Sequence, residues 1–496
     1  MRKIFFRVDY NETIGSGHIL RCMNLIKNII KNNKIILITR ANLNEKNQIK
    51  KIFINMKIDF FFLQPVYKIN KKNYSTWLRI NVKKDALETK QIINNCGGQA
   101  DDVIVIDHYG INNLWLKILN SKIKTIVLDD YIRRRINSDV IINGNIKAKS
   151  NFYKKNLSSK IYEGTKYAII SPEYKSCYKL SHKKKILIFF SNSDINQFYL
   201  KVLKCFNNFE NDLDFTIITG FQNKKFEKNI QKKNVKFFEN IKDFDKIIQK
   251  TTLAIGGCGS TYLQRLYYNI PSIIFSLSKN QVPFCKILHK NKISIYLGSE
   301  KQFKEKNLIS KIKQFLFDKS KLITLSDNSK KFIDDFSLKR VSEIISPSKK
   351  IIFSLKKAKK EHETILFHWV NDINVVKSSI SKKAISYKEH CQWYKESLKN
   401  KKIKIFIFYM NDIPIGQIRF NRIKNKYIID YSLDSFVRGR GYGSKLIKMG
   451  IKKLKNDNCK YYEAKVRKNN IISQKIFRKL NFTTKNTKNF IIFKYV

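Results

Sequence analysis

A glycine-rich loop near the start of the sequence has residue types suited to holding an anion beside polar side chains. It reads Thr13-Ile14-Gly15-Ser16-Gly17-His18 and follows an apolar run that ends at Asp9. Two glycines let the backbone turn tightly and approach a ligand, and amides at the start of the following helix favour an anion. His18 and Arg21 lie where a strand ends and a helix begins, which is where α/β proteins hold ligands. The sequence therefore predicts a site here, although a plain strand–helix turn with a capping histidine has the same pattern.

Polar residues also follow two later apolar runs. Asp107-His108-Tyr109-Gly110 ends one run, and Asp129-Asp130 ends the next. Since the carboxyl ends of parallel strands meet at one edge of a sheet, these groups are expected to converge on the first loop. The alternatives are helix N-caps for the aspartates and a satisfied surface histidine. We predict His108 and Tyr109 as site residues because of this convergence.

A second glycine-rich loop, Ile255-Gly256-Gly257-Cys258-Gly259-Ser260-Thr261, leaves a strand and enters a helix. It lacks the GK[ST] of a Walker A loop, but its amides and the helix start can hold a pyrophosphate. Ser191-Asn192-Ser193-Asp194 ends another strand and is expected to face the same cleft, and Asn280 and Gln281 are placed to reach a uracil or a ribose. A generic glycine-rich turn is the alternative.

A third glycine-rich stretch, Arg438-Gly439-Arg440-Gly441-Tyr442-Gly443, precedes the amphipathic helix SKLIKMGIKKLK. Successive amides there can cradle another pyrophosphate. A turn of this kind is a weak signal by itself, so its meaning depends on what surrounds it.

The elements that position these loops follow from the spacing of the apolar runs. Near-continuous Ile/Val/Phe runs indicate strands buried on both faces of a parallel sheet. One series occupies 3–9, 34–40, 59–63, 102–107, 125–130 and 139–143, and a second occupies 185–191, 214–220, 235–239, 252–257, 271–277 and 293–298. The fold class is therefore α/β with two Rossmann-like halves, and a cleft between such halves suits a ligand.

The pattern changes after a linker expected at Ser346–Lys350. Longer strands then lie next to each other at 404–409, 414–420 and 427–433, followed by 461–466 and 490–495, which indicates an α+β domain. The expected domains are 1–150, 151–345 and 351–496.

The net charge of +60, from 99 Lys and Arg against 39 Asp and Glu, would suit a polyanion partner. However, the lysines are dispersed and form no basic tail, so a compositional bias is the preferred explanation and no nucleic acid is expected. The eight cysteines have no metal spacing, so they are expected to be reduced thiols, with no metal. With no signal peptide and no apolar run long enough to cross a membrane, we expect a cytoplasmic protein.

The stretch FRVDYNETIGSGHILRC, with IDHYG, VLDDYIRR and IGGCGSTYLQRLYYNIPSIIFSLSKNQ, resembles the nucleotide-sugar hydrolase of pseudaminic acid biosynthesis. That family has a GT-B-like fold and cleaves UDP-2,4-diacetamido-2,4,6-trideoxy-β-L-altropyranose to UDP and the free sugar. The resemblance covers residues 1 to about 345. It implies that His18 is the general base that activates water, that Gly257, Gly259, Ser260 and Thr261 hold the pyrophosphate, and that configuration inverts at the anomeric carbon.

Two positions depart from that family's pattern. Gln264 stands where an acidic residue is usual near the ribose, and Gln can still donate and accept hydrogen bonds. Ser191 and Asn192 replace a Gly-Gly pair, which puts a close approach of the backbone to the ligand in doubt.

The third glycine-rich stretch, with Val437 before it and Val466, Asn470, Ser473, Phe477 and the closing Lys479–Phe482 after it, resembles the acetyl-CoA loop of GNAT N-acetyltransferases. The entry to this domain is similar to the subgroup that acetylates the 4-amino group of UDP-amino-sugars. The resemblance implies acetyl-CoA as co-substrate, and Asn371 and His390 are candidates to line the sugar site, with core packing as the alternative for the neighbouring tryptophans. Phe477 stands where the family often has a proton-donating tyrosine, so Tyr431, Tyr442 or water must replace it.

Together these features predict one chain that acetylates a UDP-4-amino-sugar and hydrolyses the diacetamido product. A glycosyltransferase that passes the sugar to an alcohol is one alternative. The others are a degenerate sugar-nucleotide or RNA-binding protein and a last domain that acetylates another amine, such as a protein side chain. The sequence does not fix the oligomeric state.

Overall fold

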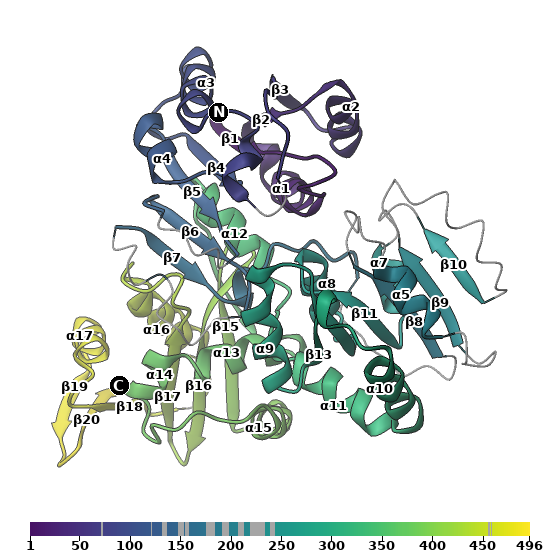
Figure 1. The fold of residues 1–496 in the computed structure, drawn as a ribbon. Helices are drawn as coiled ribbons and strands as arrows, with labels where there is room; N and C mark the ends of the chain where they lie inside the picture. Colours follow the sequence, from purple (N-terminus) through teal and green to yellow (C-terminus); the bar gives the residue numbers. More distant parts are fainter. Residues whose placement is uncertain are drawn as a thin grey trace. The chain divides into compact units, whose positions relative to one another are not determined.

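The computed structural model of this protein describes residues 1–70, 73–120, 122–130, 136–146, 153, 158–174, 184–190, 198–206, 213–218, 234–238, 244–454, 457 and 459–496. The chain forms two compact units, Met1–Pro347 and Ser348–Val496 (Figure 1). The expected linker at residues 346–350 spans this division.

Unit 1 begins with a parallel sheet whose strand order is β3-β2-β1-β4-β5-β6-β7. Its strands are β1 (Arg2–Val8), β2 (Asn33–Arg40), β3 (Ile58–Leu63), β4 (Val103–Asp107), β5 (Lys124–Leu128), β6 (Val140–Asn143) and β7 (Lys160–Glu163). Every predicted run of the first series forms a strand. The order reverses at β1, whose Val8 is in register with Asp107 of β4, so the ends of these two strands lie side by side. This is the position at which doubly wound sheets bind ligands.

The second sheet of unit 1 repeats this order as β10-β9-β8-β11-β12-β13, again with parallel pairing. Its strands are β8 (Lys184–Phe189), β9 (Leu213–Ile218), β10 (Val235–Phe238), β11 (Leu253–Gly257), β12 (Ser272–Ser276) and β13 (Ser294–Ser299). The first sheet extends past the boundary expected at residue 150, because β7 pairs with β6. This strand has the sequence Lys-Ile-Tyr-Glu, which is too short and polar to stand out as a buried run.

Helices connect the strands of unit 1 in the alternation that parallel pairing requires. The helices are α1 (Gly17–Ile29), α2 (Leu43–Ile52), α3 (Val82–Asn95), α4 (Asn113–Leu119), α5 (Phe198–Lys204), α7 (Phe244–Gln249), α8 (Ser260–Tyr267), α9 (Val282–Lys290), α10 (Glu305–Phe317), α11 (Lys319–Ser329) and α12 (Ser337–Ile345), with the short 3₁₀ helix η2 (Tyr74–Leu78). Apolar side chains of the strands pack against these helices, as Phe5, Ile104 and Trp115 do in one cluster of the core.

Unit 2 contains one sheet with the order β14-β15-β16-β17-β18-β20-β19. Its pairs are antiparallel except for β17 with β18. The strands are β14 (Phe353–Lys357), β15 (Ile403–Met410), β16 (Ile413–Ile423), β17 (Lys426–Leu433), β18 (Tyr461–Arg467), β19 (Thr483–Asn486) and β20 (Phe490–Tyr495); the helices are α13 (Glu363–Val370), α14 (Ile373–Ser378), α15 (Tyr387–Lys399), α16 (Tyr442–Lys453) and α17 (Ile471–Lys479). The edge strands β14 and β19 were not predicted, because neither has a continuous apolar run.

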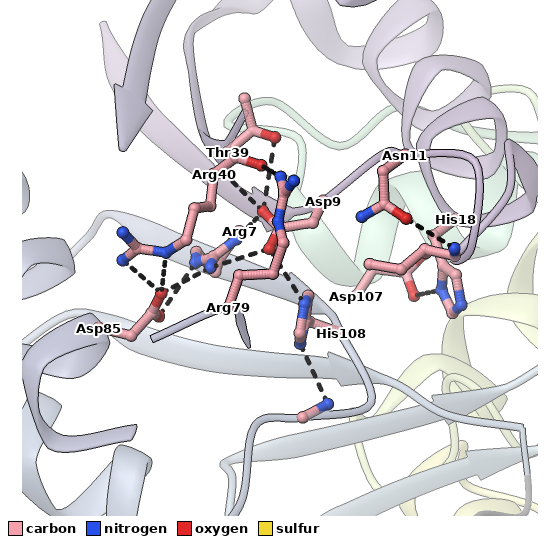
Figure 2. A network of polar contacts seen from close by, with 12 residues as sticks. Arg7, Asp9, Asn11, His18, Thr39, Arg40, Arg79, Asp85, Asp107 and His108 are labelled. Carbon is pink, nitrogen blue, oxygen red and sulfur yellow. Dashed lines mark hydrogen bonds and ion pairs between the residues drawn. The ribbon is translucent and has the colours of Figure 1, made fainter. Parts of the chain in front are cut away.

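Buried charges tie the first sheet to α3. The carboxylate of Asp85 accepts hydrogen bonds from Arg7 (2.7 Å), Arg40 (2.8 Å) and the indole of Trp115 (2.8 Å), as Figure 2 shows for the two arginines. Asp85, Arg7 and Arg40 are all 0% exposed. Burial alone would raise the pKa of Asp85, but the positive charge of Arg7 outweighs it and the pKa is lowered. Asp85 is therefore the counter-ion that allows two arginines to be buried under the sheet.

We expect Asp85→Ala to lower the free energy of unfolding of unit 1 by about 3–5 kcal/mol, because it removes the carboxylate that two buried guanidinium groups share. The measurement is urea denaturation followed by circular dichroism. Asp59→Ala is the control, since Asp59 forms an exposed pair with Lys34 on the same sheet and should change stability little. Equal stability of the two variants would contradict the role given to Asp85.

Candidate functional site

His18 and Asp107 form a pair where β1 and β4 end. His18 is the second residue of α1, and Asp107 is the last residue of β4. The Nδ1 atom of His18 lies 2.5 Å from Oδ1 of Asp107 (Figure 2). An ionised carboxylate only accepts hydrogen bonds, so Nδ1 is the donor of this contact, and the neutral tautomer that fits it has its lone pair at Nε2. This arrangement prepares the imidazole to accept a proton at Nε2.

Arg21 keeps Asp107 ionised. Its Nε and Nη2 atoms each lie 2.5 Å from a carboxylate oxygen of Asp107, in a two-pronged contact. Burial would raise the pKa of Asp107, but the charge of Arg21, aided by hydrogen bonds from Arg21 and His18, outweighs it, and the pKa is held well below its usual range. Asp107 itself was not predicted as a site residue, although its strand-end position was noted. Its role follows from the register of β1 and β4, which the sequence does not give.

An aromatic wall adjoins His18. The ring of Tyr109 meets the imidazole edge-on at 4.5 Å, and the ring of Trp77 stacks on Tyr109 at 5.5 Å. Tyr74 packs against both Trp77 and Tyr109. The hydroxyl of Tyr109 donates to Asp130 (2.7 Å), which also binds Arg21 (2.7 Å). Tyr74 and Trp77 were missed because they lie on η2, away from any strand end, and the only signal was the cluster of aromatic residues in Tyr74–Trp77.

Asp9 and His108 lie behind this site in the buried network of Figure 2. They are 0% and 2% exposed, and Nε2 of His108 lies 3.1 Å from Oδ2 of Asp9. Asp9 also pairs with Arg7 and accepts from the backbone of Arg40. Tyr109 lines the cavity and Asp107 holds His18, which also lines it, whereas His108 between them is not among the lining residues. Asp9 and His108, expected to bind substrate, instead support the strand ends.

A cavity of about 260 Å³ joins the two halves of unit 1 at His18. Residues from the first half are Thr13 to His18, Leu20, Arg21, Tyr74, Trp77, Tyr109, Leu128, Asp129, Asp130, Ile142, Gly144 and Asn145. Residues from the second half include Phe189, Phe190, Cys258, Gly259, Thr261, Leu263, Leu277, Ser278, Gln281 and Phe284. The cavity therefore contains the predicted Gly15, Ser16, Gly17, His18, Arg21 and Tyr109 together with much of the second glycine-rich loop.

The glycines of the second glycine-rich loop allow its backbone to pack closely against the end of β8. A Cβ at Gly256 would lie 1.9 Å from the carbonyl oxygen of Phe189, and one at Gly257 would lie 2.8 Å from that of Phe190. The loop ends at Gly259, the N-cap of α8, whose first amides have no partner within the helix. Gln281 accepts from the backbone of Leu277 (2.9 Å) and lines the cavity beside this loop. These groups can hold an anion against the cavity wall.

Some predicted residues of this loop region are placed differently or lie outside the description. Gln264 is half-buried and is not among the cavity-lining residues. Ser260 lies in α8, and Asn280 lies in the turn before α9. The structure does not describe the side chain of either residue. Ser191, Asn192 and Asp194 lie outside the described residues, as do residues 131–134 of the VLDDYIRR motif.

The glycine-rich turn of unit 2 forms the start of α16. Gly439 and Gly441 have left-handed φ angles of 80° and 78°, and Gly441 is the N-cap. The side chain of Arg438 donates to Asp372 (2.8 Å) and to the carbonyl of Leu433 (3.0 Å), so it braces the turn. The turn exposes backbone amides at a helix start, which is the geometry that binds phosphate groups. The other predicted residues here are Val437, which is buried, Arg440, which stacks on Phe436, Tyr442, which packs on Phe353, and Gly443, which lies against Ile476.

The strands β17 and β18 separate beside this turn. They pair only from Lys426 to Ile428 and from Tyr461 to Glu463, although they continue to Leu433 and Arg467. Separated strand edges leave backbone donors and acceptors that an extended ligand can use. At the far side, Asn470 caps α17 by accepting from Ser473, and Phe477 is 1% exposed in the core with Phe482 and Phe493.

Asn371 and His390 use their polar atoms within unit 2. The amide of Asn371 bonds to both the N–H (2.8 Å) and the carbonyl (3.1 Å) of Ile385. His390 is 1% exposed, and its Nε2 lies 2.9 Å from the carbonyl oxygen of Glu363. In this structure Asn371 joins the end of α13 to the segment that follows α14, and His390 joins α15 to the start of α13, whereas both were expected to line a sugar site.

Within the described ranges, no cluster of three or more His, Cys, Asp or Glu is arranged to bind a metal ion. In the same ranges, no helix combines the length and apolar character needed to cross a membrane.

Comparisons with known proteins support the same two-part organisation. Residues 367–482 match the model of the acetyltransferase (GNAT) family, and residues 191–341 match that of the glycosyltransferase family 28 C-terminal domain. An uncharacterized protein of Methanocaldococcus jannaschii is 24% identical over 97% of this chain and 96% of its own length. MurG of Acinetobacter baumannii is 10% identical, with a TM-score of 0.50, over 70% of this chain and 100% of its own. A ribosomal L7/L12 α-N-protein acetyltransferase, RimL, solved with coenzyme A, is 17% identical over 30% of this chain and 98% of its own, with a TM-score of 0.27.

The predicted fold class is thus confirmed: two Rossmann-like halves with a MurG-like, GT-B arrangement precede a GNAT-like domain. The expected co-substrate, acetyl-CoA, agrees with the match to the acetyltransferase family. These matches do not extend to the specific activities suggested by the sequence, which are hydrolysis in pseudaminic acid biosynthesis and acetylation of a 4-amino-sugar.

We expect Gly441→Val to weaken the binding of coenzyme A at least tenfold in isothermal titration calorimetry. Nothing lies within 4 Å of the position a Cβ would take, so the cause is strain from a left-handed φ that valine resists. Gly164→Val in unit 1, also at a positive φ with open space, is the matched control and should leave the affinity unchanged. Wild-type affinity in Gly441→Val would mean that this turn does not hold the cofactor.

Proposed function

We propose that this chain is a bifunctional nucleotide-sugar enzyme. Unit 2 acetylates the 4-amino group of a UDP-4-amino-sugar, and unit 1 hydrolyses the resulting UDP-2,4-diacetamido sugar to UDP and free sugar. The observation that carries the hydrolase assignment is His18, which is bound to Asp107 and lines the same cavity as the glycine-rich loop before α8. A base and an anion-binding loop in one cavity are the two groups that cleavage of a sugar–diphosphate bond requires.

In the proposed hydrolysis, water bound beside His18 attacks the anomeric carbon. Nε2 of His18 takes one proton from this water as the new C–O bond forms and the bond from carbon to the diphosphate oxygen breaks. The positive charge that develops on the imidazole is stabilised by Asp107, which is already ionised and bound at Nδ1. Asp107 is thus a positioning residue, since it acts through His18.

The leaving group explains why one base is sufficient. A glycosidase needs an acid to protonate a poor leaving group, and therefore uses paired carboxylates. A nucleoside diphosphate leaves as a stable anion, so amide donors at Cys258, Gly259 and the start of α8 can replace the acid. Tyr74, Trp77 and Tyr109 offer apolar faces against which a sugar ring can pack.

Two alternatives make different predictions for the same cavity. A glycosyltransferase would pass the sugar to an alcohol, so it would release little UDP without an acceptor. A degenerate binding protein would bind RNA with strong salt dependence and release no UDP at all. Steady release of UDP and free sugar from the purified chain, with water alone as acceptor, distinguishes the hydrolase from both.

For the hydrolase, His18→Ala and Asp107→Asn are each expected to lower the rate of UDP release by roughly 10²–10⁴-fold while changing UDP affinity little. His18→Ala removes the base, and Asp107→Asn removes the charge that fixes its tautomer. Initial rates come from a coupled UDP assay and affinities from calorimetry. Asp102→Asn is a control, because Asp102 caps backbone amides at the opposite end of β4. Normal turnover in His18→Ala would remove His18 from the role of base.

For unit 2, the proposed reaction is direct transfer from acetyl-CoA to a neutral amine. The amine nitrogen bonds to the carbonyl carbon and gives up one proton to solvent water, the C–S bond breaks, and the departing thiolate takes a proton from a donor in the protein. Phe477 cannot supply one. Tyr431 lies on β17 in the stretch that has separated from β18; its hydroxyl lies 3.0 Å from Oγ of Ser473 and its ring packs on Phe477 at 5.8 Å. Burial raises the pKa of Tyr431, so it is protonated at neutral pH. We assign the proton donor to Tyr431.

Tyr431→Phe should lower the rate of CoA release with a UDP-4-amino-sugar by roughly 10²-fold and leave CoA affinity unchanged, since only the hydroxyl is removed. An acetyl donor with a more acidic thiol should lose much less, because its thiolate needs no proton. Adding Phe477→Tyr to this variant restores a hydroxyl at the neighbouring ring and should recover activity in part.

Tyr442→Phe is the matched control for this assay, because Tyr442 lies at the start of α16 and packs on Phe353. Wild-type rates in Tyr431→Phe would contradict this assignment and leave water or Tyr442 as the proton donor.

A further inference from the structure

Arg265 on α8 is a buried cation with no acidic partner among the described residues. It is 1% exposed, its Nη2 donates to the carbonyl oxygen of Gly257, and its guanidinium lies over the ring of Tyr262 at 5.1 Å. Its Nε and Nη1 atoms have no hydrogen-bond partner there. By contrast, the equally buried Arg340 of α12 pairs with Asp334 at 2.9 Å. Burying an unpaired charge is costly, so the isolation of Arg265 requires an explanation.

The position of Arg265 relates it to the glycine-rich loop. In a trans peptide the C=O and the next N–H point in opposite directions. The carbonyl of Gly257 points to the buried guanidinium, so the N–H of Cys258 points to the other side of that peptide. Cys258 and Gly259 line the cavity, and no described backbone carbonyl accepts from their N–H groups. Arg265 thus lies behind the same peptide that presents an unpaired donor at the cavity.

This geometry gives the cation an electrostatic route to the cavity. A hydrogen bond to a carbonyl polarises its peptide and strengthens the N–H as a donor. The positive charge of the buried Arg265 also acts through the protein interior, where screening is weaker than in water. The first amides of α8 add their partial positive charge on the same side. All three effects favour an anion at the loop.

We propose that Arg265 is a built-in counter-charge for a diphosphate bound at the Gly257–Thr261 loop, acting through the Gly257–Cys258 peptide. It is a positioning residue that does not touch the ligand. The inference rests on the proposed function of unit 1 and deepens it by naming a source of its preference for a dianionic leaving group. The ligand then neutralises a charge that the empty protein buries at a cost.

The proposal predicts opposite effects on stability and on binding. Arg265→Met removes an uncompensated buried charge, so the ligand-free protein should melt at the same temperature or higher. The affinity for UDP should fall about 10–100-fold in calorimetry, while the affinity for uridine should change less than twofold. Arg340→Met is the matched control: it breaks a buried ion pair, so it should melt at a lower temperature and keep the wild-type ratio of UDP to uridine affinity.

Two further variants separate charge from hydrogen bonding and guard against a packing defect. Arg265→Gln can still donate to the carbonyl of Gly257 but is neutral, and it should bind UDP as weakly as Arg265→Met. Arg265→Lys keeps the charge and should retain most of the affinity. Wild-type UDP binding in Arg265→Gln, or equal losses of UDP and uridine binding in both neutral variants, would overturn the proposal and leave Arg265 with a structural role.

Inorganic pyrophosphate is the probe that separates this proposal from the proposed function. If the wild type binds pyrophosphate but not UDP, and Arg265→Gln loses pyrophosphate, the counter-charge stands and the nucleotide-sugar assignment fails. If the wild type binds UDP and Arg265→Gln binds it equally well, only the counter-charge fails. If the wild type binds neither probe, both are overturned.

Discussion

The contact between His18 and Asp107 depends on the register of two neighbouring strands. Val8 and Asp107 are paired across β1 and β4, so the loop after β1 returns the imidazole directly over the carboxylate. A shift of one residue in β4 would exchange Asp107 for His108 and reverse both side chains. The buried network of Arg7, Asp9 and His108 lies on the other side of the same strand ends and holds that register. The chemistry proposed for unit 1 is therefore fixed by strand pairing more than by the loop itself.

Buried charge in the first half of unit 1 is closely matched, in contrast to the overall charge of +60. Asp9, Asp85 and Asp107 each meet a guanidinium, and in each case the opposite charge lowers the carboxyl pKa against the effect of burial. The lysine excess lies outside this network and says little about the chemistry. What distinguishes the site is where opposite charges are paired inside the protein, and where, as at Arg265, the described part of the chain supplies no counter-ion.

Much of the fold could be predicted from the sequence, because buried parallel strands are continuous apolar runs bounded by turn residues. The strands that were missed, β7, β14 and β19, are short or polar and lie at or near sheet edges, where packing demands less of the sequence. The glycine-rich loops could also be predicted from the sequence, since glycine is favoured where φ is positive or where the backbone packs closely. The sequence could not show that Asp107 and His108 point in opposite directions, or that Tyr74 and Trp77 reach the cavity. Those facts depend on strand phase and on tertiary packing, neither of which is encoded locally.

The presence of two units in one chain, divided at Pro347 and Ser348, fixes their relative amounts. One translated chain carries one copy of each unit, so the two units are present in equal numbers whatever the level of expression. Their relative output can then be tuned only through turnover rates, never through gene dosage. In the proposed reaction sequence, slow hydrolysis by unit 1 would let the acetylated intermediate accumulate, and slow acetylation by unit 2 would leave unit 1 without substrate. Selection on such a chain acts on the balance of two rate constants.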